Sequence, residues 1–180
     1  MTDDDRGALL RLAREAIAAH LHGLPLPAPD PLPVMNLRAG VFVSLHNGSD
    51  LRGCIGHIED DRPLSAAIPS SAVAAATADP RFPPLTPAEL VAINIELSVL
   101  GPLEAITAPD QIEIGLHGLL VERGWRRGLL LPQVAVEWKW DAETFLVRTC
   151  HKAGLPEDAW KSGASLWRFS AEVFREDQTP

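Results

Sequence analysis

The stretch Leu51-Arg52-Gly53-Cys54-Ile55-Gly56, followed directly by His57, lies at the centre of the predicted fold. It places a cation, a thiol and two glycines within one short segment, after an Asn47-Gly48 dipeptide and the apolar run 41–45. Asn-Gly between two such runs is the strongest short-range signal for a β-hairpin. We therefore predict that residues 51–57 form the second strand of a hairpin.

The two faces of this strand carry different chemistry, because side chains alternate along a strand. Arg52 and Cys54 share one face, and Leu51, Gly53, Ile55 and His57 share the other. A hairpin loop of even length places Cys54 on the side of Val41 and Val43, whereas a three-residue loop reverses the faces. We expect the even case.

A carboxylate is expected beside Arg52, since an unpaired buried charge is strongly destabilising. Asp79, which lies close to Arg81 in the sequence, is the first candidate, and Glu96 is the second. Glycine inside a strand often marks a bulge or a close approach of other chain or ligand. Gly53 and Gly56 therefore predict a crowded site around Cys54.

Cys54 is a candidate catalytic nucleophile, because a neighbouring cation such as Arg52 lowers the pKa of a thiol. A general base would have to come from elsewhere, since His57 points to the other face, and His117 between two glycines is one candidate. The alternative is that Cys54 is a small buried residue and that Arg52 forms an ion pair with a purely structural role. Both interpretations stay open, as does the question whether the protein is an enzyme.

Apolar periodicity predicts an α+β fold. Helices are expected at about 6–22, 62–78 and 141–153, and half-buried antiparallel strands at 92–100 and 166–174. Prolines at alternate positions make residues 24–33 extended. Short elements and frequent glycine between them suggest one domain with two lobes, a larger lobe of about 1–101 and 164–180 and a smaller inserted lobe of about 102–163.

Composition restricts the classes of partner and compartment. Acidic residues outnumber basic ones by 24 to 16, which gives a formal charge of -8 and argues against nucleic acid. Two cysteines are too few for a disulfide scaffold, and the sequence has no long apolar run, so we expect a cytoplasmic protein that does not bind membranes. Cysteines and histidines show no short ligand spacing, so we expect neither metal nor cofactor.

Ordered motifs resemble those of the AMMECR family, which includes the prokaryotic AmmeMemoRadiSam system protein A. They are the stretch 51–56 followed by Asp79-Pro-Arg-Phe-Pro-Pro-Leu85, Ile95-Glu-Leu-Ser-Val99, Gly115-Leu-His-Gly-Leu119, Leu131-Pro-Gln-Val134 and Lys152-Ala-Gly-Leu-Pro156. The resemblance implies a larger and a smaller α+β lobe with the signature stretch facing a cleft between them. It also implies Memo-like and radical S-adenosylmethionine proteins as partners in a modification pathway.

The expected site combines the signature stretch with the charged residues that follow it. Cys54 and His117 are its candidate catalytic residues. The candidate binding residues are Leu51, Arg52, Gly53, Ile55, Gly56, His57, Asp79, Arg81 and Glu96. A protein or another large molecule is the expected substrate if Cys54 is catalytic, and a protein partner is expected if the chain is an adaptor.

Overall fold

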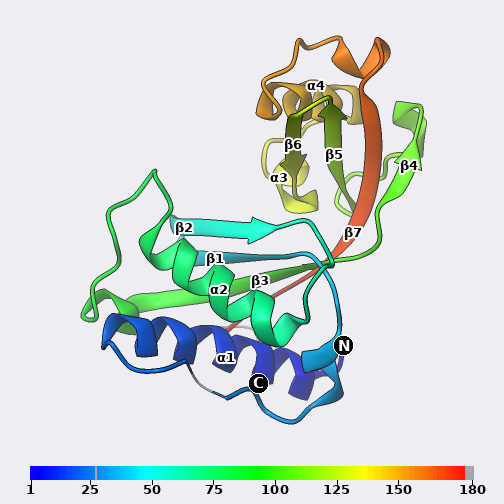
Figure 1. Ribbon diagram of the computed structural model, residues 1–180. Helices are drawn as coiled ribbons and strands as arrows, with labels where there is room; N and C mark the ends of the chain where they lie inside the picture. The colour runs from blue at the N-terminus through cyan, green and yellow to red at the C-terminus, as the bar shows by residue number, and fades with distance from the viewer. Residues whose placement is uncertain (27, 177–180) are drawn as a thin grey trace. The chain divides into compact units, whose positions relative to one another are not determined.

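The computed structural model (Figure 1) describes residues 1–26 and 28–176 and places the signature stretch on a β-hairpin. The strands are β1 (Val41–Asn47) and β2 (Asp50–His57). The intervening Gly48 has a φ of 61°, which glycine adopts without strain. Of the extended segment 24–33, Pro27 lies outside the described residues, and the described positions 24–26 and 28–31 are exposed.

The chain divides into two compact units, Met1–Leu100 with the residues from Glu172 onward, and Gly101–Ala171. In the first unit the strand order is β2-β1-β3, followed by the end of β7 (Ser165–Arg175) beside β3 (Ile93–Leu100). The helices α1 (Asp3–Leu21) and α2 (Leu64–Thr77) pack on this sheet, and short 3-10 turns lie at Pro33–Asn36 and Glu89–Ala92.

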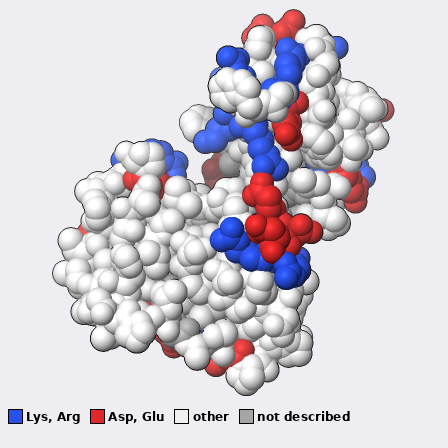
Figure 2. Space-filling model, viewed as in Figure 1, with Lys and Arg blue, Asp and Glu red and all other residues white. Residues whose placement is uncertain are grey.

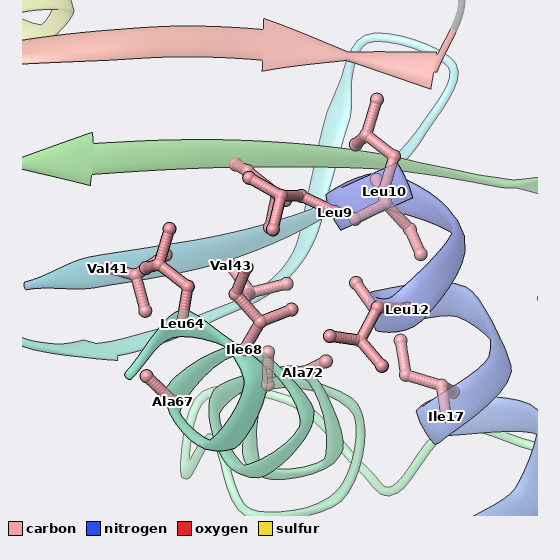
Figure 3. Packing of buried hydrophobic residues seen from close by; sticks show 14 of the residues in the cluster. Leu9, Leu10, Leu12, Ile17, Val41, Val43, Leu64, Ala67, Ile68 and Ala72 are labelled. Carbon is pink, nitrogen blue, oxygen red and sulfur yellow. The ribbon is translucent and has the colours of Figure 1, made fainter. Parts of the chain in front are cut away.

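The core of the first unit lies between the sheet and these two helices. Figure 3 shows Val41 and Val43 of β1 beside Leu64 and Ile68 of α2, with leucines of α1 completing the cluster. All four of the named side chains are fully buried. Small residues on α2 let its backbone approach β2 closely, so that a Cβ placed on Gly53 would lie 2.2 Å from the backbone oxygen of Ala75.

A β-bulge in β2 reverses the predicted faces of the hairpin. The register shifts between Leu45 and His46, which pair with Gly53 and Leu51, so Arg52 is the extra residue of the bulge. Cys54 consequently lies opposite Ser44, on the face that points away from the helices. The expectation that Cys54 shares a face with Val41 and Val43 is therefore wrong, because one extra residue changes the face of every later side chain.

The second unit has its own antiparallel strands, helices and core. Its strand order is β4 (Glu104–Ile106), the first part of β7, β5 (His117–Arg123) and β6 (Arg126–Leu130). The helices are α3 (Pro132–Glu137) and α4 (Ala142–Lys152), with 3-10 turns at Pro109–Gln111 and Ala159–Lys161. Phe145, Leu146 and Cys150 of α4 are fully buried and belong to this core.

The boundary between the two units lies within β7. Residues 165–170 pair with β5 and β4 and therefore belong to the second unit, whereas the strand beyond Ala171 belongs to the first. The predicted α+β class is confirmed, because antiparallel strands and packed helices occur in both units. Within the described residues, no helix is both long and apolar enough to cross a membrane.

Candidate functional site

Cys54 lies on β2, the edge strand of the first unit, and two side chains bind its outward-facing backbone groups. Its N–H donates to Oδ2 of Asp79 at 2.8 Å, and its carbonyl accepts from Nη2 of Arg81 at 3.3 Å. Asp79 follows the end of α2 at Thr77, where Pro80 prevents the helix from continuing. The two charged side chains thus occupy hydrogen-bonding positions that a neighbouring strand would otherwise fill.

Asp79 is the most heavily bonded group of this site. Its buried carboxylate also accepts from the backbone N–H of Arg81 at 3.1 Å and from Nε and Nη2 of the same residue at 2.9 Å and 2.6 Å. The hydrogen bonds from the guanidinium lower the pKa of Asp79 far below its usual range, although burial opposes the shift. Asp79 and Arg81 are therefore a charged pair at neutral pH, and together they hold β2 at Cys54.

The Cys54 thiol lies beside Ser44, whose hydroxyl donates to Sγ at 3.2 Å. Burial raises the pKa of the thiol, while the Ser44 hydrogen bond and the charge of Arg81 lower it to a smaller extent. The cation that acts on the sulfur is therefore Arg81 and not the expected Arg52. The thiol is protonated at neutral pH, because its pKa lies above the ordinary value for cysteine.

Arg52 is held by a different carboxylate from the two expected. Its Nε lies 3.2 Å from Oε1 of Glu89, its Nη1 donates to the carbonyl of Pro83 at 2.9 Å, and its guanidinium lies 5.9 Å from the ring centroid of Phe82. Oε2 of Glu89 accepts from the backbone and hydroxyl of Thr86, each at 2.8 Å. These bonds form a capping box, and the other carboxylate oxygen of Glu89 binds Arg52.

Glu96 is buried on the same face as Cys54, with Ser44 between them in the strand pairing. Its carboxylate accepts from Nε of Arg175 at 3.1 Å and also from Nη2. The pairing of Glu96 with Arg52 is therefore wrong. Ser44, Glu89 and Arg175 contact site residues but were not among the predicted ones, because their contacts depend on strand register and on segments distant in sequence.

His57 and His117 each make a local contact within their own unit. His57 faces α2, where its Nδ1 lies 3.3 Å from the hydroxyl of Ser71, and burial lowers its pKa. His117 belongs to the second unit, and its Nδ1 accepts the backbone N–H of Glu113 at 2.9 Å, which fixes the loop between them. Burial is also the main cause of the lowered pKa of His117.

The remaining signature residues have packing roles. Ile55 packs against the core of the first unit, and Leu51 is partly exposed near the turn. A Cβ on Gly56 would lie 2.5 Å from the ring of Phe42, so glycine makes room for that ring. Among the described residues, no group of three or more His, Cys, Asp or Glu side chains could hold a metal ion.

Comparisons with known proteins place this site in a family. A sequence model of the family described as AMMECR1 matches residues 10–174. The chain is 50% identical to a protein of Methanothermobacter thermautotrophicus, over 98% of this chain and 97% of that protein. It is 45% identical to a protein of Methanosarcina barkeri, over 99% and 93% of the respective chains.

A crystal structure of an uncharacterized protein from Pyrococcus horikoshii has a similar fold. The match covers 99% of this chain and 95% of that chain, with a TM-score of 0.93 and 42% sequence identity. These findings confirm the family resemblance inferred from the sequence, and the chain therefore belongs to the AMMECR1 family.

Proposed function

We propose that this protein is a non-catalytic adaptor that binds a protein partner, and that the signature stretch 51–56 builds its scaffold. The observation that carries the proposal is the bonding around Cys54. Asp79 and Arg81 are bound to its backbone, and Arg52 is bound to Glu89 and to a backbone carbonyl. These charged groups therefore serve the internal structure, and none of their observed bonds activates the sulfur.

An exposed aromatic side chain supports a binding role. Trp125 is 87% exposed and belongs to the second unit. Tryptophan and arginine are the residues that most often dominate the energy of protein interfaces. Trp160 packs partly buried against the core of the second unit.

A thiol-dependent enzyme is the second candidate, because Cys54 is only half-buried and a hydroxyl donor lies 3.2 Å from its sulfur. It would act on a large substrate in the radical S-adenosylmethionine-linked pathway that the family resemblance implies. Alkylation with iodoacetamide across a pH series separates the two candidates. The adaptor predicts labelling of Cys54 that becomes rapid only above about pH 9, as for an unactivated thiol.

The control is the Cys54→Ser variant, in which the remaining cysteine is the fully buried Cys150. Rapid labelling of the native protein at neutral pH that disappears in Cys54→Ser would favour the enzyme. Binding assays with purified Memo-like and radical S-adenosylmethionine proteins then test the proposed partners. An adaptor keeps its affinity for such a partner in the Cys54→Ser variant, because the thiol contributes only to packing.

A further inference from the structure

The turn between β5 and β6 presents an aromatic side chain on a rigid support. Arg123 and Arg126 are the last pair of the hairpin, so Gly124 and Trp125 form a two-residue loop. Gly124 has a φ of 61° at the first loop position, as a type II′ turn requires. The Arg126 guanidinium lies 5.3 Å from the centroid of the Trp125 ring, and the side chain is otherwise open to solvent.

Two arginines flank this turn, and both donate hydrogen bonds to uncharged acceptors. Arg126 donates to the carbonyl of Gly154 at 2.7 Å, and Arg123 donates to the carbonyls of Ala159 and Ser162. A carbonyl oxygen orients a guanidinium but carries no net charge to cancel it. The two arginines are therefore fixed beside Trp125 with their positive charge intact.

The same contacts bring the segment 152–162 to the turn and add further cations. Lys152 is adjacent to Ala153, which packs against Gly128 of β6, and Lys161 lies over the ring of Trp160 at 4.6 Å. These segments carry four cations, Arg123, Arg126, Lys152 and Lys161, together with the carboxylates of Glu122, Glu157 and Asp158. Figure 2 shows Lys and Arg side chains interspersed with Asp and Glu on the unit that contains β5 and β6.

We propose that this surface, the tryptophan turn of Trp125, Arg123, Arg126, Lys152 and Lys161, binds an acidic segment of a partner protein. The inference rests on the proposed adaptor function and names the chemistry of the partner. Charge complementarity identifies the occupant, because a local excess of cations on a chain of net charge -8 attracts carboxylates to one place. A nucleic acid or an anionic membrane would be repelled by the remaining surface over a larger area.

Selection of peptides from a random display library on the immobilised full-length protein tests the proposal. Enriched peptides are expected to be rich in Asp and Glu around an apolar residue, and their binding is expected to weaken with salt. Trp125→Ala and Arg126→Glu should each lower the affinity for the best-binding peptide by about 30-fold or more, which is the effect of losing an interface hot spot. Trp138→Ala, an exposed tryptophan of the same unit, is the matched control and should change the affinity by less than about twofold.

Several results would overturn the proposal. These are the absence of any enriched peptide, enriched peptides without an acidic bias, or an affinity that Trp125→Ala leaves unchanged. Trp125-dependent binding of an oligothymidylate or of phosphatidylserine vesicles, at lower concentration than the acidic peptide, would assign the surface to another class of partner. Peptides that bind independently of Trp125 would refute the role of the tryptophan turn but not the adaptor function. Alkylation of Cys54 tests the adaptor function separately.

Discussion

Replacing Asp79 by alanine removes the carboxylate that joins the end of α2 to the edge of β2. The variant loses bonds from the Cys54 N–H at 2.8 Å and from the Arg81 backbone and guanidinium at 2.6–3.1 Å. A hydrogen bond to a charged group contributes about 1.5–3 kcal/mol, and breaking a buried ion pair costs about 3–5 kcal/mol. Because the Arg81 side chain is 52% exposed and regains water, we expect a loss of about 2–4 kcal/mol in the free energy of unfolding.

The assay must report on the first unit, and tryptophan fluorescence does not. All five tryptophans lie between residues 125 and 167, within the second unit. Amide hydrogen exchange of β2 and α2 therefore measures the effect, and tryptophan fluorescence during denaturation serves as the internal control. Arg81→Ala and the double variant complete a thermodynamic cycle, which should give a coupling of at least about 1 kcal/mol because the two side chains share one network.

Acid stability provides an independent check on the same carboxylate. The pKa of Asp79 is lowered in the folded protein, so the stability that its charge contributes is present above the unfolded value of about 3.9. This contribution is lost as the pH falls below that value toward the lower folded pKa. The difference in the free energy of unfolding between wild type and Asp79→Asn should therefore shrink below about pH 4.

Two results would refute the assigned role of the pair. These are a decrease of less than about 0.5 kcal/mol in the free energy of unfolding for Asp79→Ala, or a coupling energy of zero between Asp79 and Arg81 in the double-variant cycle.

Three further substitutions test the packing around the signature stretch and in the second core. Gly53→Ala places a Cβ 2.2 Å from a backbone oxygen and should lower the stability of the first unit by about 1–3 kcal/mol in hydrogen exchange. The control is Gly48→Asn in the open turn of the same hairpin, which should lower the stability of the first unit by less than about 1 kcal/mol. Equal effects of the two substitutions would contradict the close packing of Gly53 against α2. Arg52→Lys keeps the charge, but the lysine cannot bind both Glu89 and the carbonyl of Pro83, so we expect the free energy of unfolding to fall by about 1 kcal/mol. An unchanged stability would show that these bonds of Arg52 do not stabilise the fold. Cys150→Ser places a hydroxyl in the core of the second unit. It should lower the free energy of unfolding, measured by tryptophan fluorescence, by about 1–3 kcal/mol, whereas a change near zero would indicate that water reaches the site.

The local pattern of the sequence was sufficient for the fold class and most elements. Alternation of apolar residues in 92–100 indicated β3, Asn47-Gly48 indicated the central hairpin, and helical spacing indicated α1 and α4. These features are short-range, because backbone geometry sets the periods of strands and helices. The family could be recognised for a related reason, since its motifs are contiguous and occur in a fixed order.

Tertiary structure alone decided what the residues of the site contact. The one-residue bulge at Arg52 turned Cys54 away from the helices, and Gly53 beside it is equally compatible with a bulge and with a close approach of other chain, so the sequence did not decide between them. The partner of Arg52 proved to be Glu89 and that of Glu96 proved to be Arg175, because folding brings together charges that are distant in sequence, whereas Asp79 bound its near neighbour Arg81. The sequence shows which charges need partners, since unpaired buried charges are costly, but several carboxylates satisfy that requirement equally well until the chain is folded.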